Sequence, residues 1–144
     1  MTGYGANQYK NMAIKSASRG QLLIMLYEGA INHLKKAAAA IDQKKYAQKG
    51  TSIGKAHDII NELSNTLDFE AGGDIARNLE RLYNFMTEQL VKANLENSKE
   101  HLLTVQKLLE TLLSAWKEAV AMVNQGGVDE KAVKPNEKSG EKTG

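Results

Sequence analysis

An all-α fold, an antiparallel up-down-up-down four-helix bundle, is predicted for the central part of this chain. Apolar residues recur with the 3.6-residue period of an α-helix, no segment alternates like a strand, and the only proline is Pro135. The 144 residues are 42% hydrophobic and 25% charged, which suits one compact domain. We therefore expect an N-terminal arm (1–17), a bundle domain (18–125) and a disordered C-terminal tail (126–144).

Capping residues and glycines define the expected helices. Ser18 and Gln21 form a capping-box pattern at the start of the first helix. Asp74 and Ser98 can cap the third and fourth helices, and Gly126 suits the left-handed end of the fourth. The connections are short, so successive helices run antiparallel. The four helices are expected at residues 18–42, 45–67, 74–95 and 99–124.

The two ends of the chain differ from this pattern. From Gly126 onward the sequence is mostly Lys, Glu, Gly, Ser and Thr, which cannot bury a core, so a mobile tail is expected. In the first seventeen residues the sizeable apolar side chains are Tyr4, Tyr9, Met12 and Ile14. We interpret that segment as a loosely held arm.

The first helix carries more apolar surface than a bundle corner needs. Its apolar residues span roughly 200 degrees of a helical wheel, so the edge formed by Ile24, Ile31 and Ala38 requires a cover. Three residues of the later helices also lie off their core stripes. Either a partner or the N-terminal arm can cover such strips. The wheel-derived candidates for partner contact are Ile24, Ile31, Phe85, Val91 and Leu103.

The sequence offers no recognisable catalytic or metal site. Cysteine is absent, which excludes a disulfide, a thiolate nucleophile and a Cys-ligated metal. None of His33, His57 and His101 follows a Glu by three residues, as the Glu-x-x-His motif of four-helix di-iron sites requires. Carboxylates are spread along polar faces. We therefore expect a protein that is not an enzyme, with no catalytic residue, no cofactor and no metal.

One alternative is a histidine phosphotransfer module, because such modules are also four-helix bundles. His33 with Lys36 resembles their spacing, but Ala37 stands where a Gly is common. His33 also projects into the edge of the apolar arc, where a phosphorylated side chain is costly to desolvate. A half-buried structural histidine is the favoured interpretation.

The charge pattern argues against nucleic acid as a partner. The net charge is only +2, and Tyr46 is the one aromatic residue near the lysines that surround the first turn between helices. Solvated faces are the favoured interpretation of those lysines. The lysines in question are Lys35, Lys36, Lys44, Lys45, Lys49 and Lys55.

No segment is apolar enough to span a membrane and no signal core is visible, so a cytoplasmic protein is expected.

Several short motifs occur in a fixed order along the chain, and the most specific is the run from Leu67 to Ala76, with Gly72 and Gly73 inside it. The other motif residues are Tyr9, Ile14, Ser16–Ser18, Leu22, Leu26–Ile31, Asn78, Leu79, Leu82, Tyr83, Ala93, Asn94 and Trp116. With these motifs the chain resembles, from residue 9 to about residue 123, the FliS family of flagellin-binding export chaperones. One departure is Arg19-Gly20, where the family usually has a proline that pre-sets the first turn.

This resemblance implies a cytosolic chaperone that binds the disordered C-terminal segment of flagellin and blocks premature filament assembly. It also implies delivery to a component of the flagellar export gate. Tyr9 and Ile14 would belong to an arm that lies on the client surface as a displaceable lid. Structural roles are favoured for Tyr27, Asn78 and Tyr83. A helix-binding regulator is a third hypothesis, and the spare apolar strips allow a homodimer.

Overall fold

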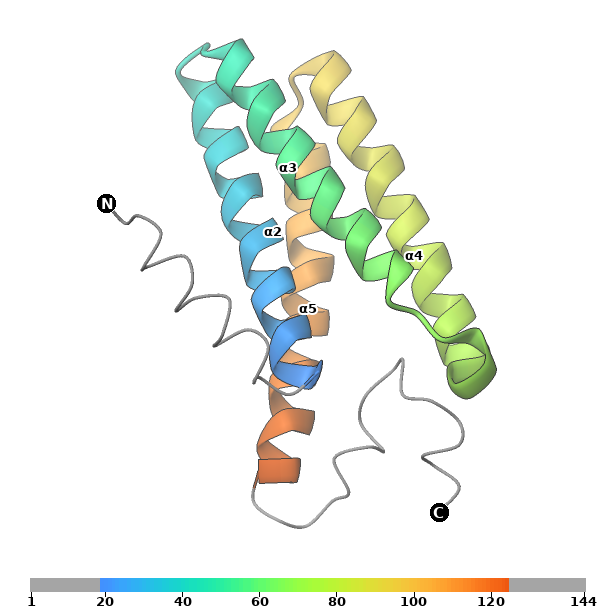
Figure 1. The fold of residues 1–144 in the computed structure, drawn as a ribbon. Coiled ribbons are helices and arrows are strands. Elements are labelled where there is room, and N and C mark those ends of the chain that lie inside the picture. The colour runs from blue at the N-terminus through green and yellow to red at the C-terminus, as the bar shows by residue number, and fades with distance from the viewer. Residues whose placement is uncertain (1–18, 125–144) are drawn as a thin grey trace, which may run out of the picture.

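The computed structural model describes residues 19–124, which form four α-helices (Figure 1). Helix α2 packs on α3 and α5, and α4 packs on the same two helices. Successive helices run up, down, up and down, which confirms the predicted bundle. The arm (1–17), the tail (126–144) and the capping residues Ser18 and Gly126 lie outside the described residues. The helices are α2 (Arg19–Asp42), α3 (Tyr46–Asn65), α4 (Phe69–Glu96) and α5 (Lys99–Asn124).

Helix α5 begins as predicted, because the backbone N–H of His101 donates to Ser98 Oγ at 3.3 Å.

Helix α4 begins earlier than the predicted residue 74. The backbone N–H groups of Glu70 and Ala71 donate to the Asp68 carboxylate, each at 3.0 Å, so Asp68 caps this helix. A kink then follows at Gly73, where φ is +52° and ψ is −127°. A residue with a Cβ is strained in that conformation.

The expected cap at Asp74 is therefore replaced by Asp68. In the structure the Asp74 carboxylate instead lies 3.4 Å from the guanidinium of Arg77, one turn further along the helix. The two glycines had suggested a loop, whereas the chain passes through Gly73 as a kink inside a helical segment. Helix α4 is thus capped and bent within its first two turns.

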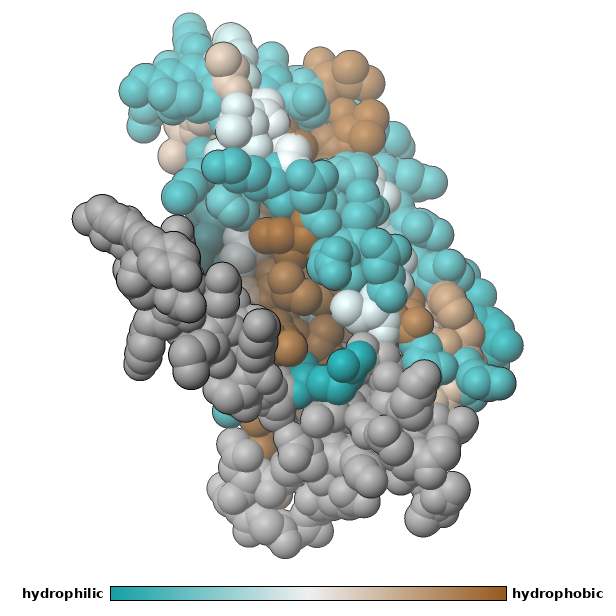
Figure 2. All heavy atoms as spheres, viewed as in Figure 1, coloured by the Kyte–Doolittle hydropathy of each residue, from teal (hydrophilic) through white to brown (hydrophobic). Residues whose placement is uncertain are grey.

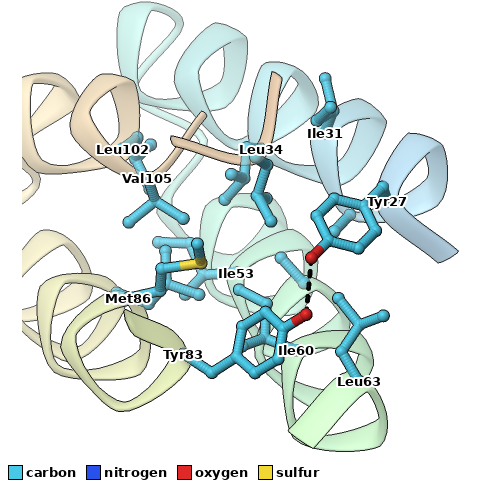
Figure 3. Packing of buried hydrophobic residues seen from close by; sticks show 14 of the residues in the cluster. Tyr27, Ile31, Leu34, Ile53, Ile60, Leu63, Tyr83, Met86, Leu102 and Val105 are labelled. Atoms are coloured by element: carbon cyan, nitrogen blue, oxygen red, sulfur yellow. Dashed lines mark hydrogen bonds between the residues drawn. The ribbon is translucent and has the colours of Figure 1, made fainter. Parts of the chain in front are cut away.

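The core contains a polar pair that joins two helices which do not neighbour one another in sequence. Figure 3 shows the rings of Tyr27 on α2 and Tyr83 on α4 pointing toward each other across the core, beside Ile60 and Leu63 of α3. Their hydroxyl oxygens share a hydrogen bond of 2.5 Å. Burial raises the pKa of both phenols, and for Tyr27 the hydrogen bonds to Tyr83 and Trp116 partly offset that rise. Both tyrosines have the structural role that the sequence favoured.

Asn78 does not tie a loop or a helix end. It is exposed, and its amide oxygen accepts a hydrogen bond from Arg81 within α4.

Lys49 also differs from the expectation of a solvated face. Its ammonium is buried and donates to the backbone oxygen of Asn94 at 2.8 Å and to Asn97 Oδ1 at 2.6 Å. Because a cation is favourable at a helix C-terminus, Lys49 fastens α3 to the end of α4.

Candidate partner-binding groove

An apolar groove lies on the outer face of the bundle, between the N-terminal half of α2 and the C-terminal end of α3. It has a volume of about 440 Å³. Figure 2 shows hydrophobic surface between the lower half of α2 and α3, bordered by hydrophilic side chains. We call it the α2–α3 groove. Its lining residues are Arg19, Leu22, Leu23, Met25, Leu26, Glu62 and Thr66.

The periodicity of α2 explains why apolar side chains line this groove. Leu22, Met25 and Leu26 are separated by three and four residues, so they project from one face of the helix. Met25 is 44% exposed, although it is a large apolar side chain. Arg19 and Glu62 contribute charges at the rim. A surface of this kind, apolar at its centre and polar at its edge, suits contact with another polypeptide.

Beyond the groove, Gly29 of α2 faces Ile59 of α3. A Cβ at residue 29 would lie 3.4 Å from Ile59 Cδ1, which is an ordinary van der Waals distance, so the two helices are in contact at this point. Beyond it, toward the turn between the two helices, a second hollow opens on the same pair of helices. We call this second site the polar hollow. It is lined by Lys36, Ala39, Ala40, Gln43, Ala47, Gln48, Thr51 and Ser52.

His33 lies on α2 between the residues that line these two sites. It is half-buried, and its Nδ1 is buried without a hydrogen-bond partner among the described residues. Desolvation by burial lowers the pKa of His33, and the nearby charges of Lys36 and Lys55 lower it further. The neutral form is therefore favoured near pH 7. These surroundings fit the structural histidine that the sequence favoured, and none of them favours phosphotransfer.

The other predicted contact residues do not line the α2–α3 groove. Ile31 is 5% exposed and belongs to the core cluster, so the exposed edge expected there is wrong. Ile24 is half-buried. Phe85, Val91 and Leu103 are exposed as expected, at 41%, 50% and 46%, but they lie on α4 and α5. The candidates Tyr9 and Ile14 lie outside the described residues.

Sequence reasoning did not name Leu22, Met25 or Leu26 among the contact candidates. The unusually wide apolar arc of α2 was the correct signal, but it has two flanks. The structure packs Ile31, on one flank, into the core, whereas on the other flank Met25 is exposed and Leu22 and Leu26 are half-buried along the groove. A helical wheel gives the width of an arc and cannot say which flank a neighbouring helix covers.

The described residues lack two further kinds of site. Residues 19–124 contain no group of three or more His, Asp or Glu side chains placed to hold a metal ion. Within the same range, no helix is both long enough and apolar enough to cross a membrane. The groove and the polar hollow are two surface sites on α2 and α3 that a partner could contact.

Comparison with known proteins identifies the family. The sequence model of the family described as flagellar protein FliS matches residues 2–123. The chain belongs to the FliS family. It is 41% identical to a flagellar secretion chaperone FliS of Salmonella typhimurium over 74% of this chain and 79% of the relative. A FliS protein of Vibrio cholerae is 40% identical, with coverages of 75% and 82%.

A third relative, the flagellar secretion chaperone FliSB of Pseudomonas aeruginosa, is 37% identical over 76% of this chain and 90% of its own length. The FliS family match contains all four helices except the last residue of α5. The groove, the polar hollow and the buried tyrosine pair therefore all lie within the family domain. Each of these relatives is named as a chaperone.

Proposed function

We propose that this chain is a cytosolic flagellar export chaperone. It binds the disordered C-terminal segment of flagellin, prevents premature polymerisation and assists delivery to the flagellar type III export apparatus. Membership of the FliS family supports the chaperone role, since the curated relatives are named flagellar secretion chaperones. The observation that carries the binding mechanism is the open apolar α2–α3 groove.

The groove suits a segment that folds when it binds. An amphipathic helix can lay its apolar face between two bundle helices, with side chains three and four residues apart as anchors. The segment is disordered before binding, so ordering it costs free energy and moderates the net affinity. A client held in this way is shielded from self-association and can still be released at the export gate.

The residues with shifted pKa values support binding rather than catalysis. Tyr27 and Tyr83 are shifted by burial in the core, where they bond to each other. His33 is shifted by burial and by two lysines. Each shift has a packing cause, and none of these groups lies in a cavity with a second reactive group of the described chain.

The other predicted contacts remain part of this proposal. Phe85, Val91 and Leu103 extend the client surface beyond the groove to α4 and α5 if the bound segment is long enough to wrap the bundle. Tyr9 and Ile14 would contact the same client surface through the arm. Ile31 is withdrawn, because a contact residue must be accessible and this side chain is buried.

A calorimetric titration of the full chain with flagellin tests the proposal. Flagellin that lacks its C-terminal segment is the comparison, and we expect binding to be lost with it. In the chaperone, Met25→Glu places a charge in the groove and should weaken binding about tenfold or more. Circular dichroism should show unchanged helicity, because Met25 is half-exposed.

The matched control is Met122→Glu. Met122 is 51% exposed near the end of α5 and lies outside the groove, so this variant makes the same chemical change at similar exposure. We expect it to bind like the unaltered chain. Equal binding of intact and truncated flagellin would contradict the proposed client, and equal weakening by the two variants would contradict the groove.

A further inference from the structure

Met25 is the only residue with a sulfur atom among the described residues that line the α2–α3 groove. It is 44% exposed, so solvent reaches this side chain while the groove is empty. Leu22 and Leu26 line the same groove but are half-buried, and Leu23 is buried. Met25 is therefore the most accessible apolar side chain of the groove.

The other methionines have different surroundings. Met86 is fully buried in the core cluster, where a dissolved oxidant has no access. Met122 is 51% exposed near the end of α5 and lies outside the groove. Met1 and Met12 lie outside the described residues. Met25 and Met122 thus have similar exposure, but only Met25 lies in the site that the proposed client would cover.

A peroxide converts an exposed methionine into methionine sulfoxide. The thioether sulfur attacks one oxygen of hydrogen peroxide, so that an S–O bond forms and the O–O bond breaks. The transferred oxygen gives up its proton, and the departing hydroxide takes up a proton and leaves as water. The sulfur is oxidised by two electrons and the peroxide is reduced by two. A methionine sulfoxide reductase reverses the change with a dithiol, which becomes a disulfide as water is released.

A sulfoxide at Met25 would make part of the groove polar. In the empty groove water can solvate the sulfoxide oxygen, because this side chain is exposed. A client segment that covers the groove removes that water and presents an apolar face in its place, which leaves the oxygen without a hydrogen bond. The cost therefore falls on the complex and not on the free chain. Binding weakens while the bundle stays folded.

We propose that Met25 is an oxidant-sensitive modification site that controls client loading of the α2–α3 groove. A peroxide oxidises Met25 in the empty chaperone, which then binds its client weakly, and a methionine sulfoxide reductase restores binding. A bound client covers Met25, so oxidation acts on empty chaperones and spares loaded complexes. This inference rests on the proposed function and adds a reversible control to it.

The test treats the full chain alone with hydrogen peroxide and removes the peroxide with catalase before flagellin is added. Peptide mass spectrometry follows the oxidation of each methionine, and the treatment stops while Met86 is still unoxidised. Circular dichroism monitors the helices. The variant is Met25→Leu, which keeps an apolar side chain of similar volume without a reactive sulfur. The matched control is Met122→Leu, the same change at similar exposure outside the groove.

We expect oxidation to weaken calorimetric binding of flagellin to the unaltered chain about 5- to 20-fold, with unchanged helicity. Met25→Leu should bind within about twofold of the untreated, unaltered chain both before and after peroxide treatment. Met122→Leu should lose affinity on oxidation as the unaltered chain does. Methionine sulfoxide reductases with dithiothreitol should restore the affinity of the oxidised chain.

Oxidation of the preformed complex gives an independent readout of the same site. With saturating flagellin, Met25 should oxidise at least about fivefold more slowly than in the free chain, because only the empty groove exposes it. Met122 should oxidise at the same rate in both samples. The comparison of the two residues within one sample removes any effect of the client on the peroxide itself.

Four results would overturn the inference. Met25 could stay unoxidised while Met122 reacts. The chain with a confirmed sulfoxide at Met25 could bind flagellin as tightly as the untreated chain. Oxidised Met25→Leu could lose affinity as the unaltered chain does, which would assign the effect to another methionine. Bound flagellin could leave the oxidation rate of Met25 unchanged. Failure of the untreated chain to bind flagellin would instead contradict the proposed function itself.

Discussion

The two sides of α2 are both rich in apolar residues, but one side is buried in the core and the other lines a surface groove. The inner side includes Tyr27 and Leu34, which are fully buried in the core. The outer side includes Leu22, Met25 and Leu26, which line an open groove. Apolar character therefore does not separate the residues that hold this fold from those that offer a site. What separates them is whether the other helices of the chain cover the side chain completely.

Polar groups show the same contrast. On the inner side the Tyr27 hydroxyl is satisfied by Tyr83. Toward the outer side, His33 Nδ1 has no described partner and Lys36 has no counter-ion within the described chain. Buried polar groups are nearly always paired in native proteins. His33 Nδ1 is the one such buried atom among the described residues, so the outer side keeps an unused hydrogen-bonding group.

The largest expected effect is on stability and comes from the inner side. Leu34→Ala should lower the free energy of unfolding by about 2 to 5 kcal/mol, because it leaves a cavity in the core. Met25→Ala removes a side chain of similar size from the outer side and should cost less than about 1 kcal/mol. Urea denaturation followed by circular dichroism measures both. Equal losses would mean that the groove residue is part of the core.

Removing one hydroxyl of the buried tyrosine pair should have a smaller effect than Leu34→Ala. Tyr27→Phe leaves the buried Tyr83 hydroxyl without its partner and should cost about 1 to 3 kcal/mol. Tyr83→Phe should cost a similar amount, because it leaves the buried Tyr27 hydroxyl without the same partner. The double variant should cost less than the sum of the two single changes. Strictly additive losses in urea denaturation would show that the two hydroxyl groups do not depend on each other.

Most of this fold could be predicted from short local sequence patterns. Helix α5 has the predicted bounds, because Ser98 supplies a cap and the apolar stripe after it is regular. The start of α4 was predicted too late, because glycines usually mark loops. In the structure Asp68 caps the first turn of α4, and Gly73 forms a kink after that turn. Lys49 was taken as solvated, although it lies four residues before Ile53 on the buried side of α3.

The site was harder to predict than the fold for a geometric reason. Four antiparallel helices with short connections can be arranged with either handedness, and the two arrangements place α3 on opposite flanks of α2. The flank with Leu22 and Leu26 faces α3 in this structure and would face α5 in the other arrangement. The sequence could therefore predict that α2 has surplus apolar surface, but it could not decide between Ile31 and Met25. That choice depends on packing between distant residues.

The smallest expected effect comes from His33, at the border between the two sides of α2. Its pKa in the folded chain lies below the ordinary value of 6.5, because of burial and then of Lys36 and Lys55. Below about pH 6.5 the unfolded chain therefore binds a proton at His33 more readily than the folded chain does. The contribution of neutral His33 to the free energy of unfolding is fully present above that pH. This contribution is lost as the pH falls from about 6.5 through the lower pKa of the folded chain.

His33→Gln should remove this part of the pH dependence and make the folded chain less sensitive to acid between neutrality and the folded pKa. The matched control is His57→Gln, which removes a histidine from α3 and keeps His33 with its two lysines. Urea midpoints measured from pH 7.5 to 5 would reveal the difference in slope. If His33→Gln kept the full slope, this side chain would be titrating as it does in solvent, and it would belong to the open outer side of α2.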